Sequence, residues 1–86
     1  MKYFSISFYI RSVEHDLRRW HEGLKQIQEG TFKYDDSMPK SCTDALYVHK
    51  AEITMDVLEW LYSLDEDKER LMTSEENSEY LRRVNR

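Results

Sequence analysis

YFSISFYI, residues 3–10, is the stretch that decides the predicted fold, because it holds no charged residue and its apolar positions alternate. A period of two is typical of a β-strand, in which successive side chains point to opposite faces. The apolar face would carry Phe4, Ile6, Phe8 and Ile10. The second face would carry Tyr3, Ser5, Ser7 and Tyr9. Neither face is charged and one strand cannot pair its own backbone groups, so we expect another strand or surface to lie against it.

The stretch that follows has the period of an α-helix. Its apolar residues recur in steps of four, three, four and three, which places them on one stripe of a helix. These residues are Val13, Leu17, Trp20, Leu24 and Ile27. Ser12 is a suitable N-cap and Gly30 a suitable residue after the last turn, so the sequence predicts a helix over about residues 13–29.

The middle of the chain fits two structures. Leu46, Ile53, Val57, Leu61 and Leu64 repeat like one face of a helix, whereas residues 45–50 alternate like a strand. We favour one helix over about residues 44–64, because it explains more of the apolar positions. Lys50 is the residue that fits this helix least well. The alternative is a strand over residues 45–50 followed by a helix from Met55.

Two further helices are predicted before the C-terminus. Ser63 with Glu66, and Thr73 with Glu76, have the spacing of a capping box, which predicts helices over about residues 64–72 and 74–84. We therefore expect a single small domain, residues 1–86, of the α+β class and rich in helix. It would have an N-terminal strand at about residues 3–10 and three to four helices. The alternative is a βαβα order with a second strand at residues 45–50.

Charge is unevenly distributed, although the net charge is only −4. Residues 52–79 hold ten acids against Lys68 and Arg70, a sum of −8. We expect no direct nucleic-acid binding, because the sequence does not cluster lysine and arginine on a face that could meet phosphates. We expect no membrane association, because no apolar run approaches the roughly 18 residues of a membrane span. A single cysteine cannot form an internal disulfide, which favours a cytoplasmic protein.

The residues with reactive side chains form no recognisable catalytic or metal-binding pattern. His15 and His21 are six residues apart and would point in different directions from one helix, and His49 is the only other histidine. Cys42 is interpreted as a small residue before a helix start. The sequence therefore predicts no enzyme activity, no cofactor and no metal site.

A binding role remains. We expect a small non-enzymatic protein that acts by binding another macromolecule, as a regulator, an inhibitor, an immunity or anti-defence factor, or a small subunit of an assembly. The short chain and its uneven acidity favour this class. The alternative is a small ligand-binding protein or an enzyme whose pocket lies at a dimer interface.

The predicted interface has two parts. The strand would pair with a second copy in a homodimer, because its edge offers unpaired donors and acceptors. The acidic region would meet a basic surface on a protein partner. The candidate interface residues are Tyr3, Ser5, Ser7, Tyr9, Glu66 and Glu69.

Overall fold

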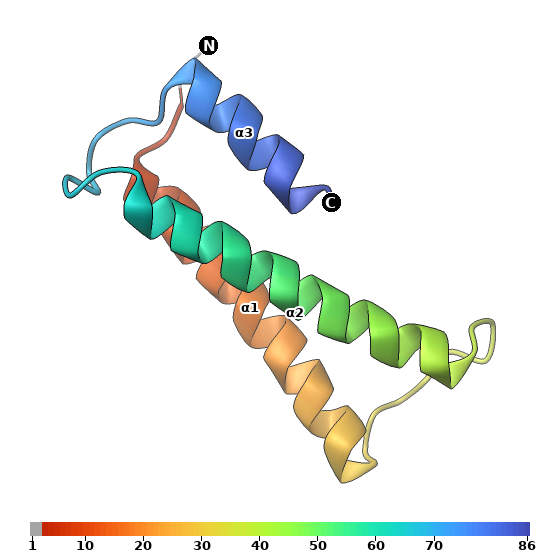
Figure 1. Ribbon diagram of the computed structural model, residues 1–86. Helices are drawn as coiled ribbons and strands as arrows, with labels where there is room; N and C mark the ends of the chain where they lie inside the picture. Colours follow the sequence, from red (N-terminus) through yellow and green to blue (C-terminus); the bar gives the residue numbers. More distant parts are fainter. Residues whose placement is uncertain (1–2) are drawn as a thin grey trace.

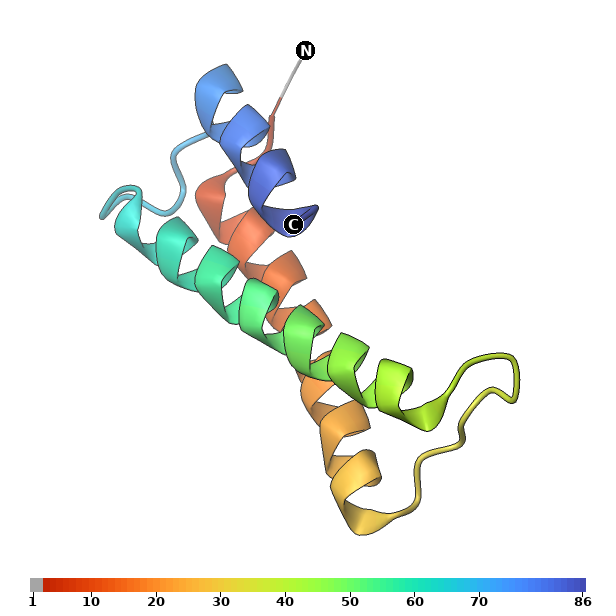
Figure 2. The ribbon, with the colours of Figure 1, turned by 45° about the vertical axis from the view of Figure 1, so that its right-hand side comes forward.

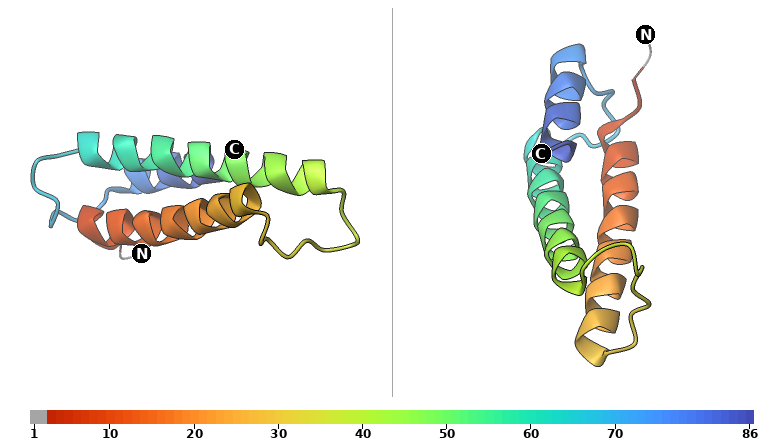
Figure 3. Two further views of the ribbon diagram at one scale, coloured as in Figure 1. Left: turned by 90° about the horizontal axis from the view of Figure 1, so that it is seen from below. Right: turned by 90° about the vertical axis from the view of Figure 1, so that its right-hand side faces the viewer.

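The computed structural model describes residues 3–86, which form three helices and the segments that join them. The helices are α1 (Ile6–Glu29), α2 (Lys40–Ser63) and α3 (Ser74–Val84). α1 and α2 run antiparallel as a helical hairpin, and α3 lies against the end where α1 begins and α2 ends (Figures 1 and 2). The molecule measures 43 × 20 × 18 Å, and the two long helices set its length (Figure 3). We call the end with α3 the core end, and the end at residues 30–39 the loop end.

The predicted strand over residues 3–10 is wrong, and so is the α+β class. Residues 3–86 contain no strand, and their strand-like pairing is limited to an isolated antiparallel bridge between Ser5 and Leu71. Ser5 is the N-cap of α1, and its hydroxyl oxygen accepts a hydrogen bond from the Phe8 backbone N–H at 3.3 Å. The protein is an all-helical bundle over its described residues.

The reason for this correction is that the same residues also fit a helical period. Ile6, Ile10 and Val13 lie four and three residues apart, so they extend the apolar stripe of the helix toward its N-terminus. All three are buried, whereas Phe4 and Phe8, the other members of the predicted apolar face, are exposed. Burial of one continuous helical stripe removes more apolar surface from water than an unpaired strand could.

The long middle helix is present, whereas two other predictions for the middle of the chain are wrong. The long helix expected over about residues 44–64 is present as α2, which begins directly after Pro39. The alternative strand at residues 45–50 is wrong, because these residues lie inside α2. The helix expected over residues 64–72 is also wrong. Asp65 and Asp67 accept the backbone N–H groups of Asp67 and Glu69 at 3.0 and 3.1 Å, which favours local turns over helix.

α3 begins where its capping box predicts. The Thr73 hydroxyl accepts the Glu76 backbone N–H at 3.1 Å, and the Glu76 carboxylate accepts the Thr73 backbone N–H at 2.9 Å. Arg82 and Arg83 lie in its last turn, where cations interact favourably with the helix dipole. This short helix therefore carries its own start and stop signals.

The hydrophobic core lies at the core end. Its buried members come from α1, from α2 and from the segment before α3: Ile6, Tyr9, Ile10, Val13, Ile53, Val57, Leu61 and Met72. Tyr80 and Val84 of α3 pack against them. Three elements thus enclose this part of the molecule, which two helices alone could not do.

The segment between α2 and α3 closes the start of α1. The backbone N–H groups of Ile6 and Ser7 donate to the carbonyls of Arg70 and Lys68 at 3.0 and 2.7 Å, and Met72 N–H donates to the Phe4 carbonyl at 3.0 Å. The first N–H groups of a helix have no partner within the helix, so these carbonyls satisfy them.

The loop end is held by aromatic contacts around a glycine. Tyr47 packs on α1 so closely at Gly23 that any side chain there would collide with its ring. Trp20 and Phe32 meet the same ring edge-on, with centroids 5.2 and 5.1 Å away. Gly30 ends α1 with φ of 76°, a left-handed conformation that glycine adopts without strain. Within residues 3–86, no helix is both long enough and apolar enough to cross a membrane.

Candidate functional site

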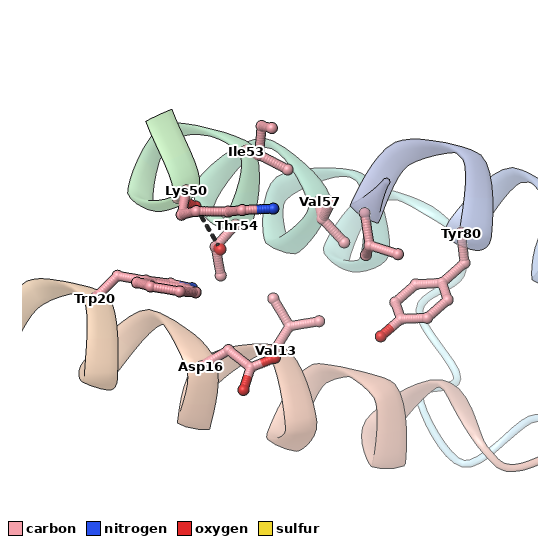
Figure 4. Close-up of a pocket in the computed structure, with 9 residues that line it drawn as sticks. Val13, Asp16, Trp20, Lys50, Ile53, Thr54, Val57 and Tyr80 are labelled. Carbon is pink, nitrogen blue, oxygen red and sulfur yellow. Dashed lines mark hydrogen bonds between the residues drawn. The ribbon is translucent and has the colours of Figure 1, made fainter. Parts of the chain in front are cut away.

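A cleft of about 250 Å³ opens between the three helices, next to the core (Figure 4). α3 has 11 residues against 24 in each of the other helices, so it covers only part of the hairpin. The cleft lies beside the last turns of α3, where Val84 lines it. Its position therefore follows from the mismatch in helix lengths.

Regular helical spacing brings the lining residues to one place. α1 contributes Val13, Asp16 and Trp20, and α3 contributes Tyr80 and Val84. The residues from α2 are Lys50, Ile53, Thr54 and Val57. Apart from the adjacent pair Ile53 and Thr54, neighbours within each helix are three or four residues apart, so each set lies on one face. The result is an apolar floor with an acid, a base and two aromatic rings around it.

The two charged groups in the cleft come from facing helices. Asp16 lies on α1, and Lys50 extends along α2 across Thr54 in Figure 4. None of the ion pairs within residues 3–86 includes Asp16 or Lys50. Both charges are therefore available to a bound group.

Tyr80 adds a hydroxyl group to the cleft. Burial raises the pKa of its hydroxyl, and the nearby Asp16 carboxylate and Tyr9 add to the increase. A tyrosine hydroxyl is protonated at neutral pH and can donate a hydrogen bond, and the raised pKa extends this state to higher pH. Thr54 already donates its hydroxyl proton to the Lys50 carbonyl at 2.6 Å, so its oxygen is left as an acceptor.

A second feature is an apolar stripe on α2, which we call the outer stripe. It consists of Val48, Met55 and Tyr62, which are 46%, 46% and 52% exposed. Their seven-residue spacing, two turns of helix, places them in one line. The exposed acids Glu52, Asp56 and Glu59 lie within the same length of α2 and are in none of the ion pairs of residues 3–86.

A third feature lies at the start of α1. The rings of Phe4 and Phe8 stack with centroids 4.2 Å apart and are both exposed, as is Leu71 in the segment before α3. Stacking covers part of each ring, so these residues shield one another as well as facing outward.

The four candidate residues from the predicted strand have other roles. Tyr9 is buried in the core, where its hydroxyl donates to Asn77 Oδ1 at 3.0 Å, and Tyr3 packs against the core. Ser5 caps α1 and its hydroxyl lies 3.1 Å from that of Ser7. These side chains do not share a strand face, and residues 3–86 offer no strand edge through which a second copy could pair. Homodimer formation itself stays a prediction.

The other singled-out residues are dispersed. Glu66 and Glu69 are exposed in the segment between α2 and α3. His15, His21, His49 and Cys42 are exposed, and the structure does not bring them together. Residues 3–86 contain no group of three or more histidine, cysteine, aspartate or glutamate side chains placed to hold a metal ion.

The sequence interpretation missed the cleft because its members come from three separate helices. The helical period predicts Trp20 on the apolar stripe of its helix, but the side chain is half-buried and forms a wall of the cleft. Lys50 is the one residue whose sequence position indicates the cleft. A lysine among the apolar positions of α2 has to place its ammonium group in a polar opening. Tyr80 gave no signal of its own.

Comparison of the chain with protein-family models, with curated proteins and with solved structures found no match.

Proposed function

We propose that this protein acts by binding another protein, and that the outer stripe of α2 receives a basic amphipathic helix of that partner. The observation that carries the proposal is the line of Val48, Met55 and Tyr62, each about half exposed, with the exposed acids Glu52, Asp56 and Glu59 along the same length of helix. A role as a regulator, an inhibitor, an immunity or anti-defence factor, or a small subunit is consistent with this mode of action.

The seven-residue spacing of the outer stripe suits contact with a second helix. Large side chains that recur every seven residues on an exposed face match the repeat of a second helix laid alongside. Tyrosine and methionine are also enriched in protein interfaces, because they bury much area and adapt to their partner. The outer stripe is outside the hydrophobic core, so burial by a partner would account for its apolar character.

The acids along and beyond α2 favour a basic partner. Residues 51–67 contain six acids, namely Glu52, Asp56, Glu59, Asp65, Glu66 and Asp67, and no lysine or arginine. A partner helix with lysine or arginine beside its apolar residues would be attracted over the whole length of the stripe. Glu66 and Glu69 extend the negative surface beyond the end of α2.

The same charges disfavour a homodimer through this surface. A two-fold symmetric contact places a patch against its own copy, so acids would face acids. Like charges brought together across an interface weaken association. The proposed occupant is therefore a different protein.

A synthetic peptide tests the proposal. The probe is a helix of about three heptads with leucine at the a and d positions and lysine or arginine at e and g. We expect saturable binding by fluorescence anisotropy at low salt, and Met55→Glu should weaken it at least about tenfold. Leu81→Glu is the matched control, because Leu81 is 50% exposed on α3, outside the stripe. Equal losses in the two variants, or no binding by the parent protein, would refute the docking surface.

Reversal of charge tests the electrostatic step separately. Glu52→Lys combined with Glu59→Lys should slow association about tenfold, whereas the dissociation rate changes less. Raising the salt from about 50 to 500 mM should slow the parent protein in the same way, because the Debye length shrinks several-fold. An association rate that does not change with salt would contradict the predicted basic partner.

A further inference from the structure

We propose that the cleft between α1, α2 and α3 binds a small zwitterion with an apolar side group, the chemistry of a free aromatic or branched amino acid. Asp16 would hold its ammonium group and Lys50 its carboxylate. The lining of the cleft includes no residue of the outer stripe, so this inference goes beyond the proposed protein contact and does not depend on it.

The size of the cleft limits the ligand. Its volume of about 250 Å³ is below the roughly 300–1,000 Å³ of pockets that hold drug-sized molecules. Nucleotides and larger cofactors are therefore too large to be enclosed. A molecule of about a dozen non-hydrogen atoms fits this space, which is the size of an aromatic amino acid.

The walls favour an apolar side group. Figure 4 shows Trp20 and Tyr80 at opposite ends of the cleft, with Val13 between them on the α1 side. Ile53 and Val57 of α2 are buried and complete the floor. An aromatic ring can meet the two end walls edge-on or stacked, and a branched aliphatic group can fill the floor.

The charges favour a ligand that carries both signs. A purely anionic ligand would be repelled by Asp16, and a purely cationic one by Lys50, because both groups line the same cleft. Lys50 is half-buried and is therefore screened less than a group on an open surface, whereas Asp16 is exposed and meets the ligand at the mouth of the cleft. An ammonium and a carboxylate on one carbon atom match an acid and a base on facing helices.

The Tyr80 hydroxyl adds a donor to this arrangement. Like any tyrosine hydroxyl it is protonated at neutral pH, so it supplements Lys50 as a partner for a carboxylate oxygen. The Thr54 oxygen is the acceptor on the opposite wall.

The experiment uses three related probes and the full chain. L-phenylalanine carries both charges, phenethylamine lacks the carboxylate, and 3-phenylpropionate lacks the ammonium group. Amide chemical shifts of the isotope-labelled protein are followed as each probe is added. We expect saturable changes confined to residues around the cleft, with phenylalanine bound about five- to tenfold more tightly than either analogue, because each charge-assisted hydrogen bond adds affinity.

Two variants assign the charges. Asp16→Asn should abolish the preference for phenylalanine over 3-phenylpropionate, and Lys50→Gln should abolish its preference over phenethylamine. Neither side chain forms an ion pair within residues 3–86, so both variants are expected to fold, as thermal unfolding would show. Asp56→Asn, an exposed acid of α2 outside the cleft, is the matched control and should bind all three probes as the parent does.

Three results would overturn the inference. The first is the absence of saturable shifts with phenylalanine at about 10 mM. This concentration is above the dissociation constant expected for a ligand of this size in a formed site. The second is equal affinity for all three probes, which would mean that Asp16 and Lys50 do not contact the ligand. The third is a loss of preference in the control variant equal to that in the two cleft variants.

Discussion

The core end and the loop end of the hairpin use the same two helices but are stabilised by different contacts. At the core end, α3 and the segment before it give α1 and α2 a third neighbour, and the buried aliphatic side chains gather there. At the loop end no third helix is present, and the hairpin is held by Tyr47 against Gly23 with Trp20 and Phe32 around it. The comparison shows that the large buried side chains lie where the third element is present, whereas the buried residues of the loop end include the small Gly23 and Thr43.

The largest expected effect on stability comes from a matched pair of substitutions on α2, one at each end of the hairpin. Leu61→Ala removes a fully buried side chain at the core end and should lower the free energy of unfolding by about 2–5 kcal/mol. Leu46→Ala removes the same group where it is 40% exposed, near the loop end, and should cost less than about 1 kcal/mol. Urea unfolding followed by circular dichroism measures both. Similar losses would show that the loop end contributes as much as the core end.

The next effect concerns the contact that holds the loop end. Gly23→Ala places a methyl group against the Tyr47 ring, and we expect a net loss of about 1–2 kcal/mol, because the ring has to move. The intrinsic helix preference of alanine over glycine, about 1 kcal/mol, opposes this loss.

A double-mutant cycle isolates the clash. In a Tyr47→Leu background the ring is gone, so Gly23→Ala should be neutral or stabilising. If Gly23→Ala costs the same in both backgrounds, the close approach of Tyr47 does not determine the stability of this end.

A third effect tests the polar contacts of the core end. Arg70 donates to Glu76 Oε1 and Oε2 at 2.9 Å and to Asp65 Oδ2 at 2.8 Å, and so joins the end of α2 to the start of α3. Glu76→Gln weakens this link and the capping box, and should cost about 1 kcal/mol at neutral pH. Glu75→Gln is the control, because Glu75 is in the same turn but exposed. Equal costs would show that the Arg70 link adds nothing.

The contribution of Glu76 to stability should depend on pH. The hydrogen bonds from Arg70 lower the pKa of Glu76 from 4.5 to about 2 in the folded protein. This carboxylate therefore stabilises the fold fully above about pH 4.5, and its contribution is lost as the pH falls toward 2. Thermal unfolding of Glu76→Gln should depend less on pH across this range than that of the parent. Parallel curves for the two proteins would contradict the assignment.

The smallest effect is expected at the loop end. The Tyr34 hydroxyl donates to Asp44 Oδ1 at 2.6 Å, and this hydrogen bond raises the pKa of the phenol above its ordinary value of 10.0. Tyr34→Phe should change the midpoint of thermal unfolding by less than about 2 °C, because the contact is at the surface. Ultraviolet titration of the parent should show one tyrosine that ionises later than in Asp44→Asn. A large loss of stability would mean that the loop anchors the hairpin.

Local signals in the sequence determined much of the helical structure. The stripe from Val13 to Ile27 predicts the greater part of α1, and the capping box of Thr73 and Glu76 predicts the start of α3. These predictions succeed because a helical period and a cap depend on residues within one or two turns of each other. The uneven charge that suggests a basic partner is likewise a property of the sequence alone.

Tertiary contacts decided what the sequence left ambiguous. Residues 3–10 fit a period of two as well as a helix, and the helix forms because Ile6 and Ile10 are buried against α2 and Met72 while distant carbonyls accept the first N–H groups of α1. The cleft could not be predicted, because Asp16, Lys50 and Tyr80 are 34 and 30 residues apart along the chain. Only the packing of three helices brings such residues together, since side-chain spacing within one helix carries no information about its neighbours.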